Sequence, residues 1–323
     1  MKTGAPKPVE RDARTSSVTP ASWVCPLRSF PDRFGHMTHG TADGLSTRVS
    51  TRAVSSTPSR WNARAERALK ASATLWFLVA VIGQWMFVTY ILAFYGRSAL
   101  QGNWGAWNQV LAHGIVPGHT MGNVALAVHL AIAAIITLGG PLQLIPLIRA
   151  KAPSFHRWNG RLYLFTAFVG SISGLYMIWT KEVTGDVVQH VGISVNAMLI
   201  MLCAALALRY ALARNFRLHR QWALRLYLAV SGVWFFRVGL MFWIAVNQGP
   251  AGFDPKTFQG PFLSFLSFAQ YLVPLAILEI YLRARDTDGA GRKFVAASGL
   301  VVLTVAMGVG IGVATRVMWL PRM

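Results

Sequence analysis

The chain has 323 residues, of which 54% are hydrophobic and only 13% charged, and its mean hydropathy is +0.44. Soluble domains carry roughly a quarter charged residues, so this composition excludes a disordered or collagenous chain and most soluble enzymes. The formal net charge of +20 would indicate nucleic-acid binding in a soluble protein. Here the basic residues lie at the ends of apolar segments, which favours a lipid bilayer as the partner and no nucleic acid.

The amino-terminal part has a different character from the rest. Residues 1 to about 70 are rich in Ser, Thr, Arg, Pro and Gly and show no apolar periodicity. Such a segment buries too little apolar surface to offset its chain entropy, so we expect residues 1–70 to form a disordered, basic, cytoplasmic tail. It has no apolar core and is therefore not a secretory signal. Two interpretations stay open: a genuine tail, or a chain that starts at Met37.

Residues 71–323 are predicted to form an integral membrane domain. Apolar runs of roughly 20 residues alternate with short polar loops, as membrane-spanning helices require. Helices are expected because every backbone polar group in hydrocarbon must be paired within its own segment. The fold class is therefore all-α, a polytopic membrane protein. The seven predicted spans lie at about 74–96, 122–148, 160–180, 189–213, 223–246, 261–282 and 294–318.

The loops between these spans differ strongly in charge. One set of alternate loops holds 13 basic residues, and the other set holds only Arg97, Lys181 and Lys256. Cytoplasmic loops of membrane proteins are enriched in Lys and Arg. We therefore predict a cell inner-membrane protein with a cytoplasmic amino terminus and a periplasmic carboxyl terminus. The basic set is Arg149, Lys151, Arg157, Arg161, Arg209, Arg214, Arg217, Arg220, Arg225, Arg283, Arg285, Arg292 and Lys293.

Two of the predicted cytoplasmic turns share a motif. The letters HRWNGRLYL stand at residues 156–164, and HRQWALRLYL stand at residues 219–228. Upstream histidines repeat as well, because His129 and His190 precede the two motifs by similar distances. An internal repeat can define an architecture. The sequence therefore predicts a duplicated four-helix core with repeat units at about 122–180 and 189–246.

The helix rise gives the depth of these histidines in the bilayer. His129 lies 20 residues before Arg149, and His190 lies 19 residues before Arg209. At about 1.5 Å per residue, both histidines are about 30 Å from the inner boundary. The motif histidines lie at that boundary. We therefore expect an outer pair of imidazoles and an inner pair.

Paired imidazoles at two levels of a helical bundle indicate a cofactor site. Facing side chains build such sites in bundle interiors, and histidine is a common axial ligand of haem iron. The candidate ligands of haem b are His129 with His190 and His156 with His219. For His156 and His219, helix capping and headgroup contacts are the structural alternative.

The region from about 120 to 285 resembles a bacterial family of multi-pass membrane proteins of unknown function. The matching residues are Gly140-Pro141-Leu142-Gln143, the His156-Arg157-Trp158 motif through Tyr163, and His219-Arg220 through Trp222. In addition, Ser154 through Gly160 is similar to a helix-opening stretch of the ascorbate-reducible transmembrane cytochromes b. That likeness implies two haems in a four-helix core, one near each face.

Some apolar spans also contain polar residues. Arg237 lies within Trp234–Gly239, where a charge is costly unless it is paired or hydrated. A haem propionate, an anionic substrate or water could serve as its partner, and a bond to a helix carbonyl is the structural alternative. Glu279 is expected to pair with Arg283 at i+4. The polar side chains of Gln84, Gln143, Asn196 and Gln270 are expected to bridge helices.

Glycine and proline predict close packing and one kink. Gly170 with Gly174, and the series Gly308, Gly310 and Gly312, predict closely packed helices. The Gly139-Gly140-Pro141 sequence, followed by Pro146, predicts a kink in the second span.

The leading functional hypothesis is an integral membrane electron carrier with bis-His haem b and a small-molecule or quinone redox partner. In this hypothesis Arg237 neutralises a propionate. The first alternative is a haem-free transporter with a solute path around Arg237 and His129. Repeated units with broken helices are common in transporters. The second alternative is an assembly factor without turnover.

Overall fold

The computed structural model describes residues 60–111, 114–180 and 185–323. Within these ranges the regular elements are helices, and the only β interaction is an isolated bridge between Asp254 and Gln259. The all-α prediction is therefore confirmed. Residues 1–59 of the expected tail, and Lys181 of the charge pattern, lie outside the described residues.

Six of the described helical segments are long and apolar enough to cross a bilayer, and there are seven candidate spans if one bent pair of helices is counted as a single span. This agrees with the seven spans expected from hydropathy. The elements are α1 (Arg60–Tyr90), a π-helical segment η1 (Ile91–Gly96), α2 (Arg97–Leu100), η2 (Trp104–Gln109), α3 (Thr120–Leu144), α4 (Pro146–Lys151), α5 (Pro153–Thr180), α6 (Val187–Leu212), α7 (Phe216–Val230), α8 (Gly232–Asn247), α9 (Pro261–Arg285), α10 (Ala290–Ala314), a second π-helical segment η3 (Thr315–Trp319) and η4 (Leu320–Arg322).

Helix α1 begins earlier than the composition suggested. Its first residue is Arg60, so residues 60–70 of the segment predicted to be disordered are helical. Good helix formers such as Ala, Glu, Arg, Leu and Lys fill this stretch. Ala65 and Leu69 are buried, and Leu69 packs against Ala296, Ala297 and other residues near the start of α10. Tertiary burial therefore extends the helix beyond the bilayer boundary.

Four helices of the two repeat units form a closed ring. Helix α3 packs against α5, α5 against α6, α6 against α7, and α7 against α3. In this ring α5 lies diagonally across from α7, and α3 lies diagonally across from α6. Buried residues from all four helices form one cluster, which includes Ile136, Tyr163, Cys203, Ala204 and Leu226. We call these helices the four-helix core.

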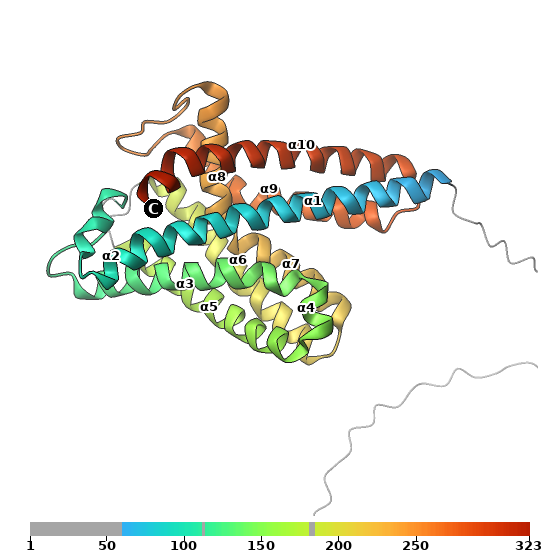
Figure 1. Ribbon diagram of the computed structural model, residues 1–323, viewed down its shortest axis with the longest axis horizontal. Helices are drawn as coiled ribbons and strands as arrows, with labels where there is room; N and C mark the ends of the chain where they lie inside the picture. The colour runs from blue at the N-terminus through green and yellow to red at the C-terminus, as the bar shows by residue number, and fades with distance from the viewer. Residues whose placement is uncertain (1–59, 112–113, 181–184) are drawn as a thin grey trace, which may run out of the picture. The chain divides into compact units, whose positions relative to one another are not determined.

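The remaining helices cover this core. Helices α1 and α10 lie along each other (Figure 1, blue-cyan and dark red) and α10 also packs against α8. Gly310 permits a close approach, because an added Cβ at this position would meet the carbonyl oxygen of Val238 in α8. Added Cβ atoms at Gly308 and Gly312 would meet nothing within 4 Å. Of the three glycines in the predicted packing series, Gly310 is therefore the one at a tight contact.

The span formed by α7 and α8 is bent by 52° between Val230 and Gly232. Ser231 lies at the bend, and Ser-Gly pairs are among the known causes of sharp kinks. The side chain of Asn196 in α6 donates to the carbonyl of Ala229 at 3.2 Å. A neighbouring helix thus satisfies part of the backbone at the bend, as hydrocarbon requires.

The break in the second span differs from the predicted one. Helix α3 continues through Pro141 to Leu144, and the chain leaves helical geometry at Ile145 before α4 begins at Pro146. The residue before a proline avoids helical geometry, and proline is favoured at the first helical position. The break therefore forms at Pro146 rather than at Gly139–Pro141.

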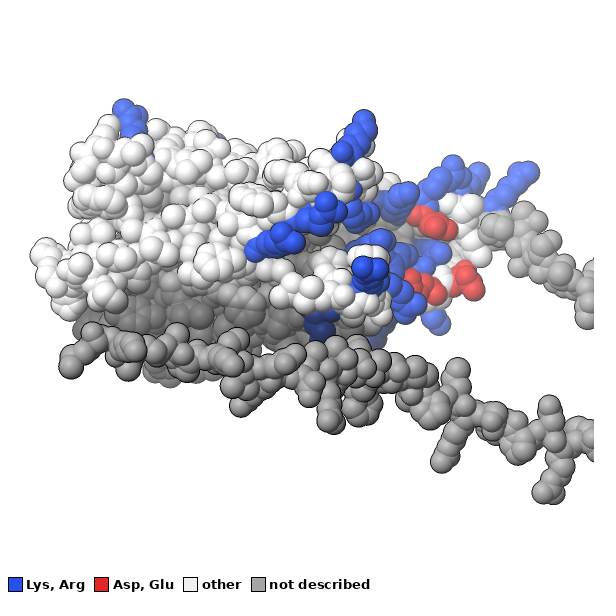
Figure 2. All heavy atoms as spheres, turned by 90° about the horizontal axis from the view of Figure 1, so that it is seen from below, with Lys and Arg blue, Asp and Glu red and all other residues white. Residues whose placement is uncertain are grey.

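Lys and Arg side chains gather at one end of the described structure, with a few Asp and Glu side chains among them (Figure 2). The chain order assigns this end to the α4–α5, α6–α7 and α9–α10 connections, which carry the basic loop residues. We call it the basic end. The charge pattern in the sequence therefore corresponds to one end of the helices.

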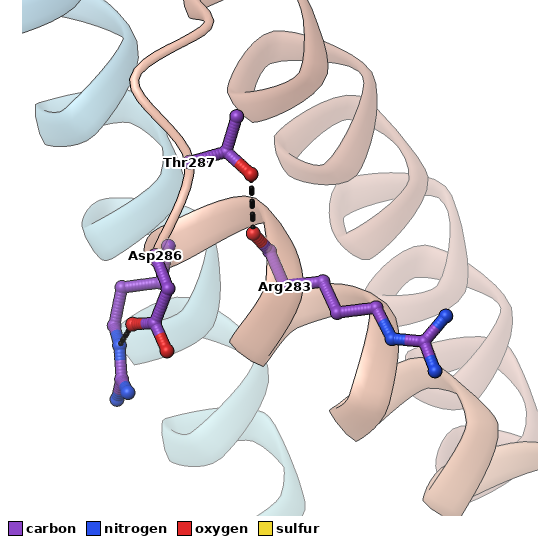
Figure 3. Close-up of polar contacts among 4 residues, drawn as sticks. Arg283, Asp286 and Thr287 are labelled. Carbon is purple, nitrogen blue, oxygen red and sulfur yellow. Dashed lines mark hydrogen bonds and ion pairs between the residues drawn. The ribbon is translucent and has the colours of Figure 1, made fainter.

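The expected Glu279–Arg283 pair is not formed. Glu279 instead pairs with Arg225 of α7, with Arg225 Nε donating to Oε1 at 2.9 Å. The Arg283 side chain is exposed, and its guanidinium points away from Asp286 (Figure 3). Its carbonyl accepts from Thr287 at 2.8 Å. An i+4 ion pair on a helix contributes little, so the bond between helices replaces it.

Candidate functional site

The two motif segments of the first repeat meet across the α3–α5 hairpin. Gln143 donates to the carbonyl of His156 at 3.3 Å, and Asn159 donates to the carbonyl of Gly139 at 3.0 Å. Asn159 is 7% exposed, so its bond forms in a protected place. The residues that suggested a family resemblance therefore fix the geometry of one hairpin.

Tyrosines from corresponding positions of the two repeats converge on Gly140. A Cβ added to Gly140 would lie 3.0 Å from the Tyr163 ring and 3.3 Å from the Tyr227 ring. The Tyr227 hydroxyl donates to Gln84 in α1, and Gln84 donates to Ser231, both at 2.9 Å. This chain of hydrogen bonds joins the four-helix core to α1 at the bend between α7 and α8.

The inner pair of histidines lies on diagonally opposed helices of the core. His156 is in α5, and His219 is in α7. Each histidine lies near the start of its helix. His219 Nδ1 lies 2.9 Å from the carbonyl oxygen of Ala207. Because a carbonyl can only accept, Nδ1 carries a proton, and in the neutral imidazole Nε2 is then the nitrogen with the lone pair.

His156 has an unused nitrogen as well. Its Nδ1 is buried and has no hydrogen-bond partner. Buried polar atoms are normally satisfied, so each exception calls for an explanation. The inner level therefore offers one oriented imidazole and one imidazole with a free, shielded nitrogen. Imidazole ligands of metals commonly donate their other N–H to a backbone carbonyl, as His219 does here.

The outer histidines contact the helix that lies between them in the ring. His129 Nδ1 lies 3.0 Å from Ser173 Oγ of α5. The His190 ring is edge-on to Trp179 of α5, with the ring centroids 5.9 Å apart, and its Nε2 is buried without a partner. His129 and His190 approach α5 from α3 and α6 respectively, and no interaction found in the described residues joins them.

Arg237 of α8 lies among aromatic side chains. Its guanidinium carbon is 5.2 Å from the centre of the Phe87 ring, and its Nη1 donates to its own helix at Val233 O, at 3.2 Å. The charge also interacts with the phenols of Tyr90 and Tyr95 and with His129. In the described ranges, the ion pairs are Arg225–Glu279 and Arg285–Asp286, and neither involves Arg237.

The π-helical segment η1 brings the two phenols together. In an α-helix, residues five apart point about 140° away from each other, whereas the i→i+5 bonding of a π-helix brings them to one side. Tyr90 directly precedes this segment and Tyr95 lies within it, and their hydroxyl oxygens are 3.4 Å apart. Their place near Arg237 was not predicted. The aromatic content of residues 87–95 was the only signal available in the sequence.

Two buried acceptors lie beside the bend of α7 and α8. Asn196 Oδ1 and Gln270 Oε1 have no hydrogen-bond partner, and the two residues are 4% and 3% exposed. The Asn196 amide and Gln270 Oε1 both lie within 4 Å of the point where a Cβ on Gly232 would stand. The side chains come from α6 and α9. The Ser231-Gly232 pair is the signal that could have located this site.

Comparison with known proteins gives one match. Residues 126–283 match the model of a family described as "Predicted membrane protein (DUF2306)". The matched segment is similar to predicted membrane proteins. It covers just under half of the chain and runs from α3 into α9, so it includes both motif copies. No curated protein and no solved structure matches the chain.

Proposed function

We propose that this protein is a b-type haem protein of the cell inner membrane that transfers electrons, with His156 and His219 as the axial ligands of its inner haem. The observation that carries the proposal is the inner histidine pair. The pair combines a position on diagonally opposed helices with two ring nitrogens available for ligation.

The donor set fits a bis-imidazole site. Haem iron takes neutral imidazole nitrogen as an axial ligand, and the Ala207 carbonyl orients His219 with its Nε2 free. The bound haem would supply one-electron chemistry. The residues of the chain would hold the imidazoles, exclude water and keep the four helices together. The Gln143–His156 and Asn159–Gly139 bonds fix the position of α5 against α3 for this purpose.

An absorption spectrum tests this proposal. The protein is purified from haem-sufficient cells, and its reduced-minus-oxidised spectrum is compared with those of His156→Ala and His219→Ala. We expect Soret and α bands in the wild type, and their loss in both variants. His119→Ala is the control, because His119 is exposed at the end opposite the basic end. A colourless wild type, or unchanged bands in both variants, would reject the proposal.

A second haem with His129 and His190 as ligands stays a prediction. Both imidazoles contact α5, so ligation of one iron requires rearrangement of this part of the core. Neutralisation of a propionate by Arg237 also stays a prediction. So do a quinone or small-molecule redox partner and the orientation of the two termini.

A haem-free transporter is the second candidate function, and the bend of α7 and α8 favours it. Discontinuous helices near the bilayer midplane form substrate sites in many transporters. Here the bend lies beside the unsatisfied oxygens of Asn196 and Gln270. A solute path would bring water to this point, although both side chains are buried in the present conformation.

Cysteine accessibility distinguishes this second candidate. Asn196→Cys is made in a Cys203→Ala background and treated with a small hydrophilic methanethiosulfonate reagent in native membranes. A solute path predicts modification at position 196 and none for Ala167→Cys, since Ala167 lies in the apolar core cluster. Equal protection of both positions would argue against a path through the bend.

A further inference from the structure

We propose that Arg237, Tyr90 and Tyr95 form a binding site for a small monovalent carboxylate, independent of any haem. The starting observation is an arginine within a membrane span for which no carboxylate partner is found in the described residues. A charge in this position is costly, and when it persists it usually marks a functional site.

The guanidinium has hydrogen-bond donors to spare. Arginine carries five N–H donors, and the hydrogen bond found for this side chain uses one of them, on Val233 O. Its position over Phe87 partly compensates the charge through a cation–π interaction. An aromatic face cannot accept the planar pair of N–H groups as a carboxylate does. The Phe87 ring therefore positions the guanidinium but leaves most of its N–H donors without an acceptor.

A second donor group lies in the aromatic cluster on which the guanidinium rests, because Phe87 stacks on Tyr90 and Tyr90 contacts Tyr95. The Tyr90 and Tyr95 hydroxyl oxygens are 3.4 Å apart, and a hydrogen bond between them uses only one of the two hydroxyl protons, so one phenol donor remains for a ligand. Trp107 fixes the Tyr95 backbone, because its Nε1 donates to the Tyr95 carbonyl at 3.2 Å. The π-helical segment therefore places a phenol donor in the same buried cluster as Phe87, the ring under the arginine charge.

The surrounding charge also favours an anion. Arg322 at the end of the chain interacts electrostatically with Tyr95, as Arg237 does. The surrounding side chains are apolar and aromatic, with Phe87, Phe94 and Trp107 in one buried cluster. A ligand with one negative charge and an apolar body suits this environment. A forked guanidinium further favours a carboxylate over a halide.

Binding can be followed with benzoate as the probe. The purified full-length protein is titrated in nanodiscs, and tryptophan fluorescence is recorded, since Trp107 packs on Tyr95 with ring centroids 5.6 Å apart. We expect a saturable change in the wild type and none with Arg237→Gln. Tyr95→Phe keeps the ring and loses the donor, so its dissociation constant should rise about tenfold.

The control is Arg316→Gln, because Arg316 is an exposed arginine in η3 near the same end of the helices. It should bind benzoate as the wild type does. Arg237→Lys keeps the positive charge but lacks the forked pair of N–H donors, so it should bind benzoate more weakly than the wild type. This variant keeps the proposal testable if Arg237→Gln does not fold. No saturable change in the wild type, or equal binding by wild type, Arg237→Lys and Tyr95→Phe, would overturn the proposal. Neither result depends on whether the preparation contains haem.

Discussion

At the scale of single residues, Tyr227 is the clearest link between the two repeats and the surrounding helices. It packs beside Tyr163 at Gly140 and donates to Gln84 of α1. Loss of one hydroxyl therefore affects the contact between the four-helix core and α1.

Tyr227→Phe should lower the free energy of unfolding by about 1–2 kcal/mol, because it leaves the buried Gln84 oxygen without its donor. Thermal unfolding in detergent measures this effect. Tyr176→Phe is the matched control, since Tyr176 is 41% exposed, and its effect should be near zero. An equal loss of unfolding free energy in both variants would show that the hydrogen bond to Gln84 does not stabilise the protein.

Asp186 controls the start of α6 through its charge. The backbone N–H of Gln189 donates to Oδ1 at 2.8 Å and holds the pKa of Asp186 below its usual value, and the Ser264 hydroxyl acts in the same direction. A lowered folded pKa gives stability that is present above the unfolded pKa of about 3.9. This stability is lost as the pH falls through the folded pKa.

Asp186→Asn keeps a good helix cap but removes the charge. We expect the wild type to have the higher unfolding temperature at pH 7, and we expect the difference to vanish well below pH 4. Thermal unfolding between pH 7 and pH 2.5 measures it. Asp288→Asn, an exposed change in the α9–α10 connection, should follow the wild type. A difference between wild type and Asp186→Asn that persists at pH 2.5 would contradict the linkage.

The sequence identified residues with unusual chemistry more readily than it identified the side chains that they contact. The motif histidines and Arg237 stood out, because their residue types are unusual where they occur. Their contacts depend on how each helix is rotated about its axis. No spacing rule indicated that His190 would pack on Trp179, or that a π-helical turn would bring Tyr90 and Tyr95 together.

At the scale of helices, α10 approaches α8 through a single glycine. Gly310→Ala should destabilise the protein by about 1–3 kcal/mol, because its Cβ would meet the backbone of Val238, which cannot move aside as a flexible side chain can. Gly308→Ala should be neutral or stabilising by up to about 1 kcal/mol, since Ala is the better helix former. Thermal unfolding of both variants, measured side by side, decides the matter. A larger loss of stability for Gly308→Ala than for Gly310→Ala would contradict the close contact between Gly310 and Val238.

The helices themselves follow from hydropathy because lipid imposes the same demand on every span. Breaks are harder to predict, since a break is stable only where neighbours satisfy the freed backbone groups. The bend at Ser231 depends on Asn196, 35 positions away in another helix. Proline alone suggested a kink near Pro141, but Pro141 lies inside α3 and only Pro146 coincides with a break.

At the scale of the whole molecule, the basic end predicts the orientation in the membrane. Single cysteines replace Arg285, at the basic end, and Leu100, which is 92% exposed at the other end, in a background without Cys25 and Cys203. An impermeant maleimide added to cells with a permeabilised outer membrane should label Leu100→Cys. Arg285→Cys should react only after lysis. The reverse labelling pattern would refute the positive-inside assignment.

The bend in the seventh span also constrains how the chain enters the membrane. Helix α7 has 15 residues and α8 has 16, so each is about 23 Å long and falls short of the 30 Å hydrocarbon layer. If the pair is one span, neither piece is long enough to cross alone, and the two cross as one unit. Their junction becomes sheltered only when α1, α6 and α9 supply Gln84, Asn196 and Gln270. Biogenesis of this region should therefore finish late, after α9 has left the ribosome, and a chain truncated before α9 should be a ready target for membrane proteases.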